Sequence, residues 1–72
     1  METLLNEHQE IDRIIISSIF LEKSNTEIAQ TVGYSVSFVK RRIAAIFRQY
    51  GVKSKVGLVR EILKTNINKH LS

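Results

Sequence analysis

The side chains best suited to chemistry in this chain lie between Ser37 and Arg48, where helical spacing brings them to one face. At about 100° per residue, that face combines long cationic donors with small residues: Ser37, Lys40, Arg41, Ala44 and Arg48. A DNA major groove admits one helix, and its reader needs long donors plus small residues where the backbone comes close. We therefore expect Lys40 and Arg41 to meet base edges, while Ser37 and Ala44 give access.

Other cations are placed to meet the DNA backbone. Arg42 lies toward the flank of the same face and is expected to contact a phosphate, as is Arg48 one turn further on. Lys53 and Lys55 stand at the start of the last expected helix, where free N–H groups add to their charge. These positions divide the cations into those expected to contact base edges and those expected to contact DNA phosphates.

Two of these assignments have plain structural alternatives. Arg42 can instead form an ion pair with Glu27 or Glu61. Thr26 lies in the first turn of a short expected helix. Its hydroxyl can bind a phosphate there, or Thr26 can be a residue of the helix start that binds no ligand.

Charge is divided unevenly along the 72 residues. Residues 1–38 carry six acidic side chains and two cations, whereas residues 39–72 carry nine cations and one acidic side chain. A basic half is typical of a surface that binds a polyanion, although a solvated basic face gives the same pattern.

Enzyme and metal chemistry are not expected. His8 and His70 stand alone near the termini without ligand neighbours at metal spacing, cysteine is absent, and no glycine loop is placed to hold a phosphate. We expect no enzyme activity, no metal and no cofactor. The apolar run at residues 14–21 is far shorter than the roughly 20 residues of a membrane span, so no membrane partner is expected either.

The elements that position these side chains are predicted to be helices only, in one domain over residues 1–72. We expect four helices, over residues 6–21, 25–32, 36–50 and 55–68. The tail at 66–72 either extends the last helix or frays.

The boundaries of the middle helices follow from local chemistry. Ser24 begins a capping box with Glu27, and Gly33 suits the left-handed conformation that ends a helix. Ser35 caps the next helix only two residues later, a turn that makes the two helices cross steeply as in a helix-turn-helix. Gly51 ends that helix.

Apolar spacing predicts which faces are buried. The first helix is expected to bury Ile11, Ile14, Ile15 and Ile19, and the third helix Val39, Ile43, Ile46 and Tyr50. The last helix has two apolar edges. Leu58 and Ile62 suit the core, which leaves a second edge for a partner, formed by Val56, Val59, Leu63 and Ile67.

The stretch from Ser24 to Val59 resembles the LuxR/GerE-type helix-turn-helix. The chain has "SNTEIA", "VGYS", "SVSFVK", "YGV" and "SK" in the order and at the spacing of that family. Lys40 matches the lysine of the family's T-V-K motif, and Lys55 matches the basic residue after L-G-V. The chain departs from the family at four positions. Thr26 replaces a lysine, Phe38 replaces a threonine, and Glu22 stands where a glycine often closes the first helix. Gly57 lies inside the fourth helix, where it is expected to mark a close contact with another helix.

The resemblance implies a function and partners. The second and third helices would bind the major groove of double-stranded DNA, and the fourth would mediate a homodimer on a roughly palindromic site. The chain would then be a stand-alone GerE-like transcription regulator, cytoplasmic and nucleoid-associated in a bacterial type of cell. The alternative is a helix-turn-helix kept as a protein-interaction module that sequesters another regulator.

Overall fold

Capping residues and glycines divide the chain into four helices, as the sequence predicts. The computed structural model describes the backbone of residues 7–71 and the side chains of residues 9–65. The helices are α1 (Glu7–Phe20), α2 (Asn25–Val32), α3 (Val36–Tyr50) and α4 (Lys55–Leu71), and residues 7–71 contain no strand. The prediction of an all-α fold with four helices is confirmed.

Two predicted boundaries differ from those observed. α1 ends at Phe20, one residue early, and Asn6 at its predicted start lies outside the described residues. α4 continues three residues beyond the predicted end, to Leu71. The backbone of residues 66–71 therefore extends the last helix.

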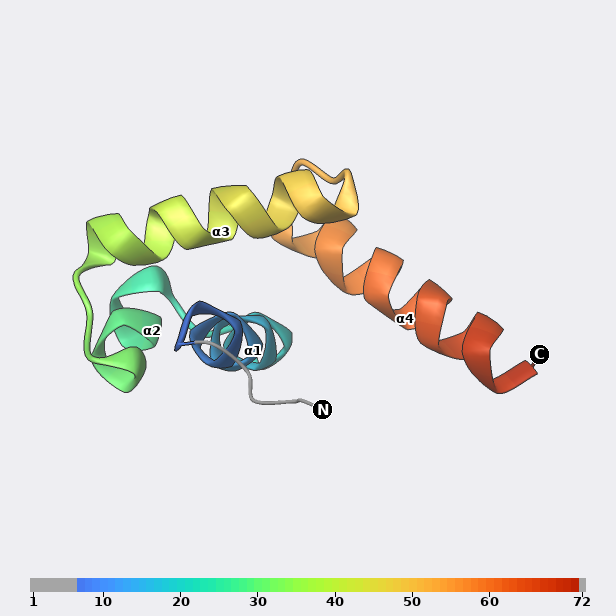
Figure 1. The fold of residues 1–72 in the computed structure, drawn as a ribbon, viewed down its shortest axis with the longest axis horizontal. Helices are drawn as coiled ribbons and strands as arrows, with labels where there is room; N and C mark the ends of the chain where they lie inside the picture. The colour runs from blue at the N-terminus through green and yellow to red at the C-terminus, as the bar shows by residue number, and fades with distance from the viewer. Residues whose placement is uncertain (1–6, 72) are drawn as a thin grey trace.

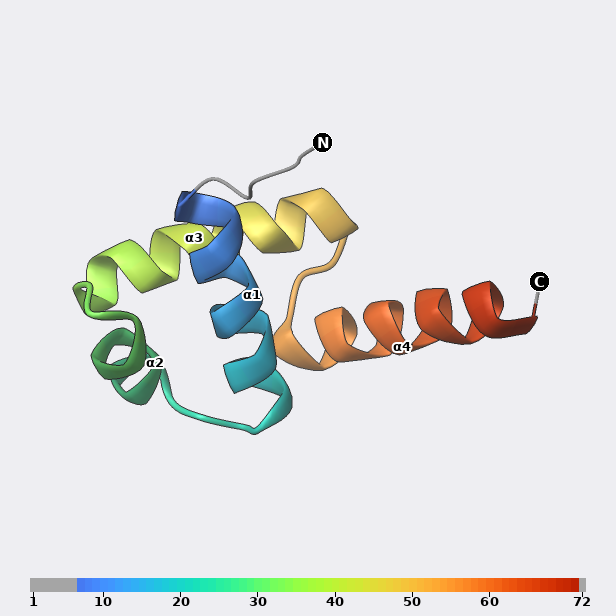
Figure 2. The same ribbon diagram turned by 60° about the horizontal axis from the view of Figure 1, so that its bottom comes forward.

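The four helices form a body of three with one projecting arm. α2 and α3 lie on either side of the turn at residues 33–35, α1 packs against both, and the far half of α4 points away from the other three (Figures 1 and 2). The molecule measures 39 × 32 × 20 Å along its principal axes.

The start of α2 is a complete capping box. The Glu27 backbone N–H donates to Ser24 Oγ at 3.1 Å, and the Ser24 backbone N–H donates to Glu27 Oε1 at 2.8 Å. Gly33 ends the helix with φ of +77°, a conformation that side chains with a Cβ rarely adopt. Ser35 then accepts from the Phe38 N–H at 3.1 Å and begins α3.

The turn after α1 has the same hydrogen bonds as a glycine-capped helix end, but without a glycine. The Lys23 N–H donates to the Ser18 carbonyl at 3.0 Å, and the Glu22 N–H donates to the Ile19 carbonyl at 2.9 Å. Glu22 has φ of +60°, the left-handed region that favours glycine. A glutamate therefore carries strain at the position where the resembled family often has glycine.

The start of α4 is capped by Ser54. Ser54 Oγ accepts from the Gly57 N–H at 3.0 Å. A Cβ added at Gly57 would stand 3.2 Å from that same oxygen and 3.4 Å from Val52 Cβ. Gly57 thus marks a close approach to the preceding loop and not a contact between two helices.

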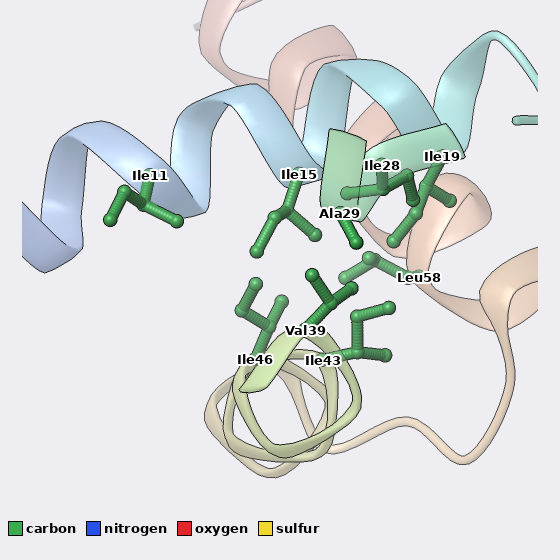
Figure 3. Packing of buried hydrophobic residues seen from close by; sticks show 9 residues of the cluster. All are labelled: Ile11, Ile15, Ile19, Ile28, Ala29, Val39, Ile43, Ile46 and Leu58. Carbon is green, nitrogen blue, oxygen red and sulfur yellow. The ribbon is translucent and has the colours of Figure 1, made fainter. Parts of the chain in front are cut away.

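The core lies where all four helices meet (Figure 3). Its buried apolar members are Ile11, Ile15, Ile19, Ile28, Ala29, Val39, Ile43, Ile46 and Leu58. Burial of such side chains supplies most of the stabilisation available to a chain of this size, at about 25 cal/mol per Å² of apolar surface.

One predicted core residue is wrong. Ile14 is 37% exposed, whereas Ser18 is only 5% exposed and donates its hydroxyl to the Ile14 carbonyl at 2.8 Å. Ile14 lies about 100° around α1 from Ile15, whose side chain is fully buried. The core receives the stripe centred on Ile15, so Ile14 falls at its margin.

Candidate nucleic-acid interface

The outward face of α3 presents the side chains that sequence spacing places there. Ser37, Lys40, Arg41, Ala44 and Arg48 are all exposed. On the other side of the helix, Val39, Ile43 and Ile46 are at most 6% exposed. The predicted orientation of this helix is therefore confirmed, and its three cations and two small residues share an open surface.

An aromatic pair supports the N-terminal end of this face. The rings of Tyr34 and Phe38 stack, with centroids 4.3 Å apart and planes inclined by 22°. Phe38 also packs against the core, so the pair ties the turn before α3 to the buried side of the helix. This pair is not among the predicted features, although two aromatic residues four positions apart across a helix start are a signal for it in the sequence.

Arg42 contacts a carboxylate of α1. Its Nε donates to Asp12 Oδ1 at 3.0 Å, and its Nη2 donates to Asp12 Oδ2 at 2.7 Å, in a half-buried position. The expected alternative partners, Glu27 and Glu61, are wrong. The hydrogen bond to Asp12 holds the pKa of Arg42 above its ordinary value, against the opposing effect of burial.

Asp12 and Arg42 are brought together because α1 crosses behind the flank of α3. Two charge-assisted bonds in one plane fix both the separation and the rotation of the paired groups. Arg42, predicted to meet a phosphate, thus joins α3 to α1.

Lys55 joins the first turns of two helices. Its Nζ donates to Asn25 Oδ1 at 2.9 Å, which connects the start of α4 to the start of α2. The partner is a neutral amide, so this hydrogen bond brings no opposite charge to the lysine. Thr26, next in the chain to Asn25, and Lys53, two residues before Lys55, are both exposed.

The predicted partner edge of α4 lies in a groove. Val56, Val59 and Leu63 line a space of about 900 Å³ together with Ile19 and Phe20 at the end of α1. Ile67, the fourth residue of that edge, has its side chain outside the described residues. The α1 side of this groove is not predicted from the sequence, because the spacing of residues along one helix does not reveal which other helix lies beside it.

Two features are absent from the described part of the chain, a cluster of metal-ligating side chains and a membrane-spanning helix. Among its residues, no three His, Cys, Asp or Glu side chains gather as they would around a metal ion. None of its helices is both long enough and apolar enough to cross a membrane. The exposed face of α3 carries cations and small residues, whereas the groove between α1 and α4 is lined mainly by apolar surface.

Comparison of the chain with protein-family models, with curated proteins and with solved structures found no match in any of the three.

Proposed function

We propose that this chain is a sequence-specific DNA-binding transcription regulator that inserts α3 into the major groove. The observation that carries the proposal is the exposure of Ser37, Lys40, Arg41 and Ala44 on one side of α3, opposite three buried apolar side chains. A helix with long donors and small residues on an open face has the shape and chemistry that base readout needs. The resemblance to the LuxR/GerE-type helix-turn-helix supports the same function.

The contacts to the DNA backbone come from cations around this face. Arg48 and Lys53 are exposed, and Lys55 stands at the meeting point of the α2 and α4 starts. Backbone N–H groups at helix starts attract phosphate oxygens, and a nearby lysine strengthens that attraction. We assign these three cations and Thr26 to phosphate contacts.

Arg42 has a different part in this proposal. Its bidentate bond to Asp12 sets the position of α3 on α1 and hence the angle at which α3 enters the groove. Its charge still adds to the positive field of the face.

The protein would bind as a symmetric dimer, each copy reading one half-site. Two-fold symmetry makes the DNA site approximately palindromic, with half-site centres about one helical turn, or 10 base pairs, apart.

The test is selection of bound duplexes from a random pool, followed by a salt titration of the selected site. We expect an enriched inverted repeat. The logarithm of affinity should fall linearly with the logarithm of salt concentration, with a slope of about −0.9 for each phosphate neutralised. A pool without enrichment contradicts sequence-specific binding, and a flat salt plot contradicts DNA binding altogether.

A second candidate is a protein-interaction module that sequesters another regulator. Val56, which is 68% exposed, and Leu63, 48% exposed, favour some protein contact at the groove. Such a module would show no preference among duplexes and would not shift DNA in a gel. It would instead remove a regulator's own shifted band when the two are mixed.

A further inference from the structure

The groove between α1 and α4 has room for a small molecule. Figure 2 shows α4 starting beside the second half of α1, and the space between their side chains is about 900 Å³. Small-molecule sites in proteins typically measure roughly 300–1,000 Å³. Ile19 is buried where it lines this space, whereas Phe20, Val56 and Leu63 are between 38% and 68% exposed along it. The groove therefore offers apolar surface that a hydrocarbon chain would cover.

The charged side chains around the groove leave an excess of positive charge. Five of them line it, the cations Lys23, Lys55 and Arg60 and the carboxylates Glu22 and Glu27. Glu27 already accepts the backbone hydrogen bond of the α2 capping box at 2.8 Å. Lys55 donates to a neutral amide, and Arg60 forms neither an ion pair nor a hydrogen bond within residues 9–65. This balance favours a ligand that carries a negative charge.

Arg60 stands among the exposed apolar side chains of α4. It follows Val56 by four residues and precedes Leu63 by three, so the three side chains share one face of the helix. An arginine side chain presents planar N–H donors that match both oxygens of a carboxylate. A ligand whose hydrocarbon part covers Val56 and Leu63 therefore has a partner for an acidic end group within the same face.

The opposite edge of the groove is formed by a strained turn. Glu22, which lines the groove, has φ of +60° without being a glycine. The turn is held by the hydrogen bond from the Lys23 N–H to the Ser18 carbonyl at 3.0 Å. Strained backbone conformations of this kind gather at ligand-binding sites, where the surrounding structure maintains them. The strain at Glu22 is a second observation, independent of the apolar surface, that points to binding here.

We propose that this groove binds a small amphiphilic acid of the fatty-acid type, with its hydrocarbon chain on Phe20, Val56 and Leu63 and its carboxylate at Arg60. The proposal goes beyond the proposed function and does not depend on it, because no residue of α3 lines the groove and binding needs no DNA. The apolar residues line a hollow between two helices. A single chain fits such a hollow, whereas the flat surface of a lipid bilayer does not enter it.

Decanoate is the probe, used below the concentration at which it forms micelles. Its binding to the full chain without DNA is followed by the amide NMR signals of the isotope-labelled protein. We expect the signals of Phe20, Val56 and Leu63 to move with one dissociation constant, while those of Lys40 and Ala44 on α3 stay unchanged.

Two further ligands separate the contributions of head group and chain. Decyltrimethylammonium has the same chain and the opposite charge, and it should bind at least about tenfold more weakly than decanoate. Octanoate is two CH₂ groups shorter. It should also bind about tenfold more weakly, because each CH₂ group removed from water contributes up to about fourfold in affinity.

Arg60→Gln tests the assigned partner of the carboxylate. It removes the charge but keeps hydrogen-bonding groups, and we expect it to weaken decanoate binding about three- to tenfold while leaving decyltrimethylammonium no weaker than before. Leu63→Asn, a change of similar size at a 48% exposed position, should weaken both ligands at least about threefold. Circular dichroism of each variant establishes that the helices are intact.

Arg13→Gln is the matched control for Arg60→Gln. Arg13 is an exposed cation of α1 outside this groove, and the substitution changes net charge by the same amount. The dissociation constant of decanoate should stay within about twofold of that of the unaltered chain.

Four results overturn the proposal. The groove signals do not move with decanoate in the millimolar range, the two head groups bind equally well, or Arg60→Gln changes binding no more than Arg13→Gln does. In the fourth, another occupant takes the groove: its signals depend on protein concentration before any ligand is added, or the chain sediments with phosphatidylglycerol vesicles, and in either case decanoate does not bind. The first case of this fourth result assigns the groove to a second copy of the chain, and the other assigns it to a membrane surface.

Discussion

Asp12 and Arg42, 30 residues apart in the chain, form a bidentate ion pair that joins α1 to α3. Both oxygens of the carboxylate are used, at 3.0 and 2.7 Å from the guanidinium nitrogens. The side chains are 18% and 26% exposed, so the pair is only partly screened by water. Its burial is intermediate between that of exposed ion pairs, which contribute little to stability, and that of fully buried ion pairs, whose desolvation is costly.

Replacing Asp12 by Asn removes the charge and leaves the arginine half-buried without its partner. We expect a loss of about 1–2 kcal/mol in the free energy of unfolding, measured by urea denaturation. Arg42→Lys should also destabilise, because an ammonium group does not make the planar two-bond contact. Glu10→Gln, which neutralises an exposed carboxylate of the same helix, is the control and should change stability by less than about 0.5 kcal/mol. Equal losses for Asp12→Asn and Glu10→Gln would show that the pair contributes nothing.

Glu22→Gly should stabilise the fold, since it relieves the φ of +60° after α1. The left-handed conformation costs a side-chain-bearing residue about 1–2 kcal/mol, and the greater freedom of glycine in the unfolded chain cancels part of that gain. The expected net effect is a rise of about 0.5–1 kcal/mol in the free energy of unfolding, measured by thermal or urea denaturation.

Glu10→Gly makes the same exchange inside a helix. It should instead lower the free energy of unfolding by about 1 kcal/mol. Opposite signs for these two substitutions are the diagnostic result. A loss of stability at both positions is incompatible with strain at Glu22.

The free energy of unfolding should fall at acidic pH, because the Glu27 carboxylate becomes protonated there. The hydrogen bond from the Ser24 backbone N–H is the main reason that the pKa of Glu27 lies below its ordinary value, and Lys23 adds to it. The folded state therefore binds this proton less readily than the unfolded state, so the contribution is present above about pH 4.3, the ordinary pKa of glutamate, and is lost as pH falls below it.

Glu27→Gln should flatten that part of the curve of melting temperature against pH. Ser24→Ala removes the hydroxyl of the capping box but keeps the backbone donor. It should lower the melting temperature at every pH while keeping most of the acid dependence. If the two variants show the same pH profile, the backbone bond is not the cause.

The cations of α3 and α4 should differ in their effect on DNA binding. Lys40→Ala and Arg41→Ala are each expected to weaken binding to the selected duplex by about 1–3 kcal/mol. Binding to random duplexes should weaken far less, because contacts to base edges provide the preference among sequences. Lys55→Ala should weaken both duplexes about equally, because a phosphate contact carries no sequence information. Equilibrium titrations of selected and scrambled duplexes with each variant measure this division.

Asn25→Ala is the control for Lys55. It removes the 2.9 Å hydrogen bond and leaves the lysine charge in place. Binding should then remain near that of the unaltered protein. A loss as large as that of Lys55→Ala assigns the lysine to joining α2 and α4 and not to phosphate.

The sequence by itself determined the boundaries of α2 and α3 and the buried side of α3. Ser24 with Glu27, and Gly33 after α2, act through hydrogen bonds and backbone conformations within a few residues, which local chemistry predicts. The burial of Val39 and Ile46 follows from a period of 3.6 residues once the segment is helical.

Only the tertiary structure decided which helices lie side by side. The partner of Arg42 depends on how α1 crosses α3, and that crossing brings Arg42 to Asp12 and not to Glu27 or Glu61, the two partners that the sequence suggests. The exposure of Ile14 and the presence of Phe20 beside Val56 depend on the same packing. Periodicity gives the angle of a side chain around its own helix axis, whereas contacts between helices require the relative position of two axes, which is set by the whole core at once.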